Sequence, residues 1–173
     1  RRLKASPETS CIPVLILTAL DREPKRRTAY RTGADEYLTK PFAPDTLIER
    51  LRACLEAARR AVEAPGGQVR LTVEPSGAMD DLKFPNALAR ALHHRTDLSP
   101  ETVETLREHL LDLVEAAGRR AGETDGVPVV RITATVESGR VRLTFDPLAG
   151  GAEAFLDEHV GPDAAAAVAL RNA

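Results

Sequence analysis

The sequence predicts an α/β unit followed by an α+β unit, and three patterns support this prediction. Two apolar runs, residues 12–20 and 35–42, have the length of buried strands and are separated by one helical segment. A break containing proline and glycine at 64–68 separates this part from residues 69–173. The order of strand, helix, helix and hairpin that follows is typical of an α+β sandwich with its helices on one sheet face.

The first unit, residues 1–63, continues with two helices. Residues 21–32 are predicted to form a short polar helix that ends at Gly33, and Pro44 opens a second helix that runs to Glu63. Apolar side chains recur in the second helix at helical spacing and predict one buried face, formed by Leu47, Leu51, Cys54, Leu55 and Ala58.

The second unit begins with a predicted strand at 69–75 and a helix around 86–95. A longer helix follows, with Ser99 as N-cap, Pro100 in its first position and Glu101 near its positive end. Its predicted apolar stripe consists of Val103, Leu106, Leu110, Leu113, Val114 and Ala117. Residues 128–146 alternate with period two and predict a hairpin that turns at 137–140, with Ile132, Ala134 and Val136 on the same side as Val141, Leu143 and Phe145.

Composition excludes some classes of partner. The 173 residues carry 24 basic and 26 acidic side chains, a formal charge of −2, so no global field attracts nucleic acid or an anionic membrane. No apolar run approaches the roughly 20 residues of a membrane span. The two cysteines, Cys11 and Cys54, have no spacing that suggests a metal or a disulfide framework, which fits the cytoplasm.

Thr18 and Lys40 each stand at the end of a predicted strand. Two parallel strands joined by a right-handed helical crossover present their carboxyl ends at one edge, where open α/β sheets bind ligands. A hydroxyl and an ammonium brought together there can hold a phosphoryl oxygen. The pair therefore predicts half of a phosphate site.

These residues carry a resemblance to the C-terminal half of a response-regulator receiver domain, which has a flavodoxin-like fold. The matching features are Thr18 followed by Ala19, the Gly33-Ala34-Asp35 turn, Tyr37, and the tripeptide Lys40-Pro41-Phe42. The resemblance implies that Thr18 and Lys40 contact an aspartyl phosphate, that the bond before Pro41 is cis, and that Tyr37 acts as a switch residue.

The resemblance also implies an acidic pair that binds Mg²⁺ and an acceptor aspartate, and none of them has a matching residue in this chain. The chain is therefore expected to be a receiver fragment whose other half lies upstream of Arg1, and Mg²⁺ is expected only in the complete receiver. A sensor histidine kinase is the implied partner. The incomplete sheet also predicts that the chain self-associates or stays loosely ordered in its first 60 residues.

The second unit resembles, less closely, the ATPase domain shared by histidine kinases and anti-sigma-factor serine kinases. The aligned residues are Glu108 and Asp112 on the long helix, and Asp146 and Gly150 after the hairpin. Asp112 replaces an asparagine that holds Mg²⁺ on ATP, and Leu148 replaces a glycine at which the backbone turns around the base. We therefore expect a protein-interaction output without enzyme activity. An active serine kinase or ATPase output and a DNA-binding regulator remain the alternatives.

Overall fold

The computed structural model describes residues 2–19, 23–63, 68–137, 139–160 and 168–170. The described part of the chain is a mixed α/β structure. Its elements are α1 (Arg2–Ala5), α2 (Pro7–Ser10), β1 (Leu15–Thr18), α3 (Glu23–Arg31), β2 (Glu36–Thr39), α4 (Pro44–Glu63), β3 (Gln68–Val73), the 3-10 helix η2 (Met79–Leu82), α5 (Lys83–Arg95), α6 (Pro100–Gly122), β4 (Val130–Glu137), β5 (Arg140–Pro147), α7 (Ala152–His159) and β6 (Val168–Leu170).

The first unit contains the predicted βαβ order. Strands β1 and β2 pair in parallel, with Leu15 opposite Glu36 and Thr18 opposite Thr39, and α3 connects them. Among the described residues the sheet has two strands, so β1 has a strand neighbour on one side. The short helices α1 and α2 precede β1 and were not predicted, because neither is long enough to show a period.

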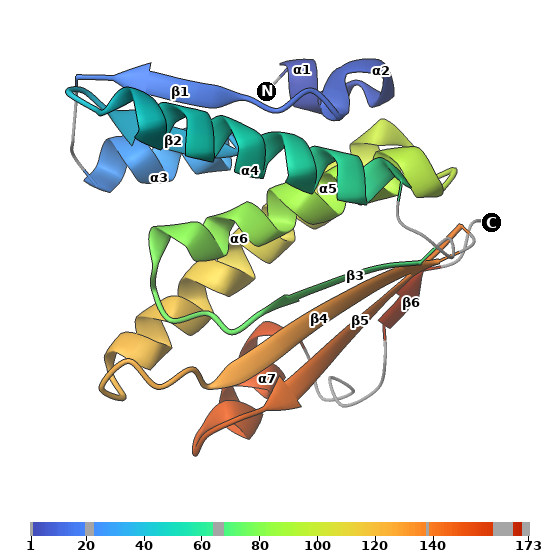
Figure 1. The fold of residues 1–173 in the computed structure, drawn as a ribbon. Coiled ribbons are helices and arrows are strands. Elements are labelled where there is room, and N and C mark those ends of the chain that lie inside the picture. The colour runs from blue at the N-terminus through green and yellow to red at the C-terminus, as the bar shows by residue number, and fades with distance from the viewer. Residues whose placement is uncertain (1, 20–22, 64–67, 138, 161–167, 171–173) are drawn as a thin grey trace.

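The second unit is a four-stranded antiparallel sheet in the order β3-β4-β5-β6, with α5 packed against β3 and β4 (Figure 1). The hairpin prediction is confirmed, because Ile132 faces Phe145, Ala134 faces Leu143, and Val136 faces Val141. All six side chains are buried. The sheet begins at Gln68, within the predicted linker, while residues 64–67 lie outside the described part. Helix α7 and strand β6 were not predicted.

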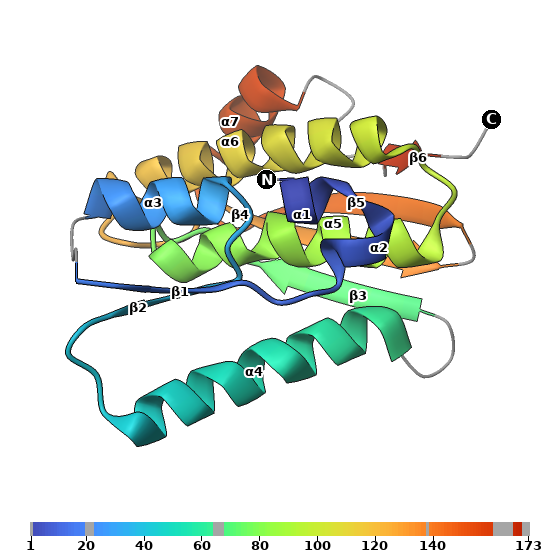
Figure 2. The ribbon, with the colours of Figure 1, turned by 90° about the horizontal axis from the view of Figure 1, so that it is seen from above.

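The two units share one apolar core. Tyr30, Ala34, Tyr37 and Ala61 of the first unit belong to the same buried cluster as the α5, α6 and sheet side chains. Helix α4 packs along α5, on the outer side of the molecule in Figure 2. The layer formed by α5 and α6 therefore lies between the antiparallel sheet and the first unit.

Only part of the predicted face of α4 is buried. Cys54 and Ala58 are buried, together with Ala61, whereas Leu51 and Leu55 are 40% and 53% exposed. Ile48 is also exposed, so α4 presents an apolar strip of Ile48, Leu51 and Leu55 to solvent. The prediction was wrong about this strip because helical spacing does not show how many neighbouring elements are present to cover it.

Helix α6 buries one face that is wider than the predicted stripe. The predicted stripe contains Val103, Leu110 and Val114, all buried in the core. Leu111, which was not in that stripe, is only 1% exposed and lines a cavity together with Thr28 of α3. Leu111 thus lies on the side of this face that meets the first unit, which explains why the buried face is wider than the predicted stripe.

Gly118 on α6 lies directly against the loop after β3. A Cβ atom on Gly118 would be 2.8 Å from both the Cα and the N atoms of Gly77, whose φ of 89° favours glycine. We expect Gly118→Ala to lower the free energy of unfolding by about 1–3 kcal/mol, because backbone atoms must move apart. Chemical denaturation measures the change.

Gly122, at the end of the same helix, is the matched control because a Cβ there would meet nothing within 4 Å. Gly122→Ala should leave stability unchanged or raise it by up to about 1 kcal/mol, through helix propensity. Equal effects of the two substitutions would show that the close approach of Gly118 to Gly77 does not constrain the fold.

Candidate functional site

The carboxyl edge of the parallel sheet brings Thr18 and Lys40 together. The Lys40 amide donates a hydrogen bond to the Thr18 carbonyl oxygen over 2.7 Å, directly beyond the last strand pair. The Thr18 side chain is half-buried and Lys40 is exposed. A hydroxyl group and an ammonium group therefore stand on adjacent chain segments, as the βαβ order predicted; what they bind stays a prediction.

Three further residues of the receiver resemblance lie around this edge. The Lys40–Pro41 peptide bond is cis, and both Pro41 and Ala19 are exposed. Tyr37 is 7% exposed, and the Arg26 guanidinium carbon lies 5.8 Å from the centroid of its ring. In this structure the Tyr37 side chain is thus buried, with the Arg26 guanidinium over the face of its ring.

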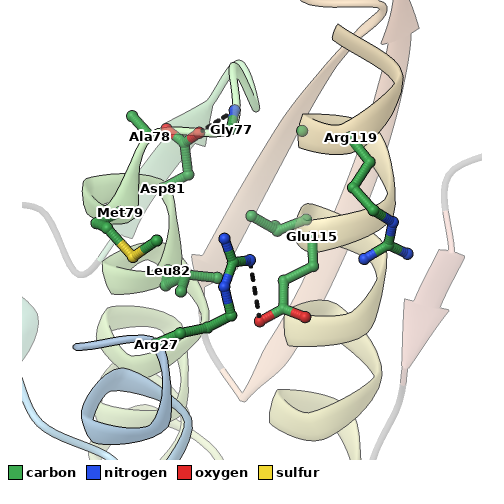
Figure 3. A pocket seen from close by; sticks show the side chains of 10 residues that line it. Arg27, Gly77, Ala78, Met79, Asp81, Leu82, Glu115 and Arg119 are labelled. Atoms are coloured by element: carbon green, nitrogen blue, oxygen red, sulfur yellow. Dashed lines mark hydrogen bonds and ion pairs between the residues drawn. The ribbon is translucent and has the colours of Figure 1, made fainter. Parts of the chain in front are cut away.

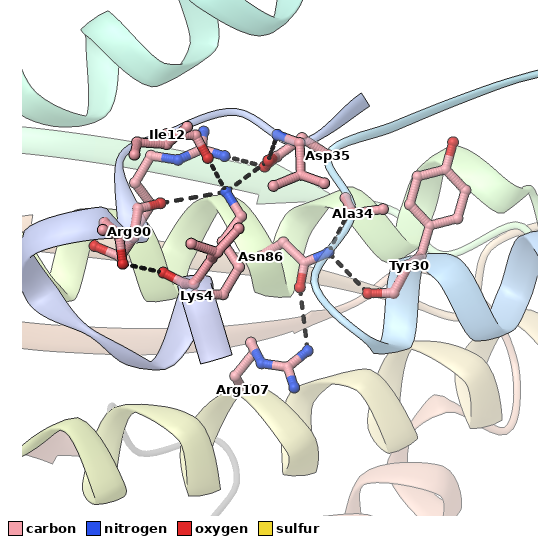
Figure 4. A network of polar contacts seen from close by, with 12 residues as sticks. Lys4, Ile12, Tyr30, Ala34, Asp35, Asn86, Arg90 and Arg107 are labelled. Atoms are coloured by element: carbon pink, nitrogen blue, oxygen red, sulfur yellow. Dashed lines mark hydrogen bonds and ion pairs between the residues drawn. The ribbon is translucent and has the colours of Figure 1, made fainter. Parts of the chain in front are cut away.

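The opposite, amino edge of the sheet carries a buried charge cluster around Asp35. Its Oδ2 atom accepts a hydrogen bond from the Val14 amide at 2.8 Å and lies 2.6 Å from Lys4 Nζ (Figure 4). Its Oδ1 atom pairs with Arg90 of α5, whose side chain is 3% exposed. Burial lowers the pKa of Lys4, although the attraction of Asp35 opposes this. The turn before β2 is therefore tied to both α1 and α5.

Asn86 and Arg107 bind the same turn through backbone carbonyl groups. Asn86 Nδ2 donates to the carbonyl oxygens of Tyr30 and Ala34 at 3.0 and 2.9 Å. Arg107 Nη1 donates to the Arg31 carbonyl at 3.1 Å and to Asn86 Oδ1 at 3.2 Å. The Tyr30 carbonyl also accepts a hydrogen bond from the Gly33 amide at 3.0 Å, so the two side chains bind both the last turn of α3 and the turn that follows it.

Glu36 forms a second charge cluster at the start of β2. Its carboxylate lies 2.8 Å from Lys83 Nζ and 3.3 Å from Arg50 Nη1, and the Tyr30 hydroxyl donates to it at 3.3 Å. Burial is the largest influence and would raise the pKa of Glu36, but the hydrogen bonds from Lys83 and the Tyr37 amide and the charges of Lys83 and Arg50 together outweigh it, so the pKa is lowered. Burial and the neighbouring Glu36 charge raise the pKa of Tyr30.

Ion pairs join α3 to α6. Arg31 lies 2.9 Å from Asp112 and 3.4 Å from Glu115, and Arg27 lies 3.7 Å from Glu115. Figure 3 shows the Arg27–Glu115 pair beside a cavity of about 180 Å³ under the loop of Gly77. Asp81 holds that loop by accepting a hydrogen bond from the Gly77 amide at 3.1 Å.

In the described part of the chain, the four nucleotide candidates do not share either of the two cavities that Glu108 and Asp112 line. Glu108 lines a cavity of about 310 Å³ against α3, whereas Asp112 borders one of about 570 Å³ between α6, β5 and the end of α7. Asp146 and Gly150 are exposed and line neither. Asp112, which would face Mg²⁺ on ATP, is instead paired with Arg31. The residues present therefore do not fit a Mg-nucleotide at this place.

The receiver edge alone does not fit Mg²⁺ either. Its two candidate side chains are a hydroxyl and an ammonium, and an ammonium is no metal ligand. Within the described ranges, no group of three or more His, Cys, Asp or Glu side chains could hold a metal ion. Within the same ranges, no helix has the length and apolar character needed to cross a bilayer.

Comparisons with known proteins find relatives of one part of the chain, about a third of its length. It is 42% identical over 62 residues to the phosphate regulon transcriptional regulatory protein PhoB of Rhizobium meliloti, covering 36% of this chain and 27% of that protein. It is 41% identical over 64 residues to the DNA-binding dual master transcriptional regulator RpaA of Synechocystis, covering 37% and 27%. The chain contains a response-regulator region.

A third relative, the uncharacterized transcriptional regulatory protein YclJ of Bacillus subtilis, is 46% identical over 48 residues, or 28% of this chain and 21% of that protein. The chain thus spans about a quarter of the length of the curated relatives it matches. No family model matches the chain, and no solved structure matches it.

Sequence reasoning missed the residues that join the two units. Asn86, Arg90 and Arg107 are polar residues on amphipathic helices and would ordinarily be placed in solvent. A weak signal was present, because Asn86 and Arg90 are spaced i, i+4 on the same helix face as the buried residue Leu82. Their partners are backbone carbonyls and a turn carboxylate far away in sequence, which no local pattern indicates.

Proposed function

We propose that residues 1–63 act as the phosphoryl-contacting part of a two-component response-regulator receiver, in which Thr18 supplies a hydroxyl donor and Lys40 a cation. The observation that supports this most directly is their juxtaposition at the carboxyl edge of β1 and β2. In this proposal the acidic residues and the acceptor aspartate belong to residues outside this chain, and a sensor histidine kinase supplies the phosphoryl group.

The chemistry assigned to this edge is electrostatic. A phosphoryl group on an aspartate carries negative charge on its free oxygens, which an ammonium neutralises and a hydroxyl stabilises by donating a hydrogen bond. Neither residue forms a covalent bond to phosphorus. Their role is to favour the phosphorylated state and to respond to it, in the cytoplasm where such a kinase would deliver its signal.

Phosphate uptake tests this function. The protein extended by the residues encoded upstream of Arg1 should incorporate phosphate from acetyl phosphate into an acid-stable, hydroxylamine-sensitive acyl phosphate. The 173-residue chain alone should not, because no residue in it matches the acceptor. Aspartyl phosphorylation of the 173-residue chain would contradict the proposal.

We further propose that residues 69–173 provide a protein-interaction output rather than an ATPase or a DNA reader. The pairing of Asp112 with Arg31 and the separation of Asp146 from Glu108 favour this over an ATPase. The named relatives are transcriptional regulators, and their DNA-binding names belong to those proteins. The formal charge of −2 provides no overall attraction to DNA, which disfavours a DNA reader.

Calorimetry with Mg-ATP separates the protein-interaction output from the kinase alternative. We expect a dissociation constant no tighter than about 1 mM, equivalent to roughly 4 kcal/mol of binding. Asp146→Asn should then change nothing. Micromolar binding that Asp146→Asn abolishes would establish the serine-kinase or ATPase alternative instead.

Self-association remains a further prediction of the same account. Ile48, Leu51 and Leu55 on α4 and Leu17 on β1 are exposed apolar side chains, and among the described residues β1 pairs with β2 alone. We propose that receiver residues outside this chain cover this surface. In their absence, association between copies is the expected way to bury it.

A further inference from the structure

Three buried polar side chains of the second unit, Asn86, Arg90 and Arg107, hold the turn between α3 and β2. Their exposed fractions are 6%, 3% and 3%. We refer to these three residues as the polar clamp. All of the clamp's partners across the boundary lie in residues 30–35, on the carbonyls of Tyr30, Arg31 and Ala34 and on the carboxylate of Asp35 (Figure 4).

The clamp admits one position of the turn. A buried polar group without a partner loses its hydration and gains nothing in return, so displacement of the turn leaves several donors unsatisfied at once. Arg107 also donates to Asn86 and is held by Glu104 at 2.6 and 2.8 Å. Arg107 and Asn86 are therefore held by contacts within the second unit as well as by the turn, and a displaced turn would leave their donors to the turn without partners.

Helix α3 connects this clamp to the opposite edge of the sheet. It has nine residues, a length of about 13 Å at 1.5 Å per residue. Its amino end follows β1 on the side of Thr18 and Lys40, and its carboxyl end carries the carbonyls that the clamp holds. Ion pairs from Arg27 and Arg31 bind the same helix to α6. A shift of α3 at either edge must therefore move groups at the other.

We propose that the α5–α6 layer of the second unit reads the position of α3 through the polar clamp, so that a change at the Thr18–Lys40 edge reaches residues 69–173 within the same chain. This proposal deepens the proposed function: the origin of the signal, a phosphoryl group at the Thr18–Lys40 edge, rests on that function. The coupling between α3 and the second unit is a property of the 173-residue chain itself. Its test requires no phosphorylation, so a failure would leave the receiver proposal intact.

Hydrogen exchange of the 173-residue chain tests the coupling, because coupling between two sites is reciprocal. Asn86→Ala should accelerate hydrogen exchange of the Ala34 amide by about tenfold, because the buried hydrogen bonds that hold the turn are lost and the amide loses protection. The Lys40 amide, which bonds to Thr18 at the far edge, should accelerate by the same factor. His94→Ala, an exposed position on the same helix, should change neither rate.

Two outcomes would overturn the proposal. If the Ala34 amide accelerates and the Lys40 amide does not, the clamp acts only locally. If both amides exchange as slowly as those of β4 in the wild-type chain, α3 never moves independently and there is no position to read. Should Asn86→Ala fail to fold, Arg107→Lys is the second variant, because it keeps the charge but loses the Nη1 atom that donates to both the Arg31 carbonyl and Asn86. The exchange rates of the Ala34 and Lys40 amides in Arg107→Lys then decide.

Discussion

Replacing Arg90 by alanine should lower the free energy of unfolding by about 3 kcal/mol. The side chain is 3% exposed and pairs with Asp35, which is 10% exposed, so the substitution leaves a buried carboxylate with one cation fewer. Breaking a buried pair by removing one partner typically costs about 3–5 kcal/mol. The lower end applies because Lys4 and the Val14 amide still contact Asp35.

Arg70→Ala is the matched control for this measurement, because Arg70 is an exposed arginine on β3. Its effect should stay within about 0.5 kcal/mol. Denaturant unfolding followed by near-ultraviolet circular dichroism is well suited here, since the chain has no tryptophan and both of its tyrosines, Tyr30 and Tyr37, are buried in the first unit beside the second. A loss below 1 kcal/mol for Arg90→Ala would show that the two units are not held together by the Asp35 cluster.

Leu111→Ala should destabilise the chain by about 3–4 kcal/mol, within the range for truncating a fully buried leucine. Leu111 is 1% exposed and lies on the face of α6 that meets the first unit. Leu113→Ala, on the face that the sequence pattern emphasised, should cost only about 1 kcal/mol because Leu113 is half-buried beside an open cavity.

The comparison of these two leucines decides whether the units dock as described. If Leu113→Ala were the more damaging substitution, the buried face of α6 would follow the predicted stripe and would not extend toward the first unit. Equilibrium unfolding in urea measures the loss of unfolding free energy for both variants. The curves are fitted with one shared m-value, the slope of the unfolding free energy against urea concentration.

Elements with a strong local pattern could be predicted from the sequence. The period-two alternation of residues 128–146 predicted the β4–β5 hairpin and its register, since each residue's face follows from its position in a strand. Thr18 and Lys40 were placed at one sheet edge by the topology of a right-handed crossover, without any information on tertiary contacts. Ser99 caps α6 as predicted, accepting a hydrogen bond from the Thr102 amide at 3.1 Å.

Features that depend on contacts between the units could not be predicted. The burial of Leu111 and the exposure of Leu55 both depend on which element lies opposite, and helical spacing carries no such information. Asn86 and Arg107 are buried because carbonyl groups of another unit supply their partners. Buried polar side chains such as these are exceptions to the rule that the interior is apolar. They occur where their hydrogen bonds fix how one element sits against another.

Phosphoryl transfer to the upstream-extended protein tests the central claim most directly, by comparing wild type with Lys40→Ala and with Lys25→Ala. Lys25 is an exposed lysine on α3 that has no part in the proposed site. The account predicts that wild type and Lys25→Ala take up phosphate from acetyl phosphate and shift the exchange of α5–α6 amides, whereas Lys40→Ala shows no such shift. A phosphate-induced shift in Lys40→Ala equal to that of wild type would contradict it.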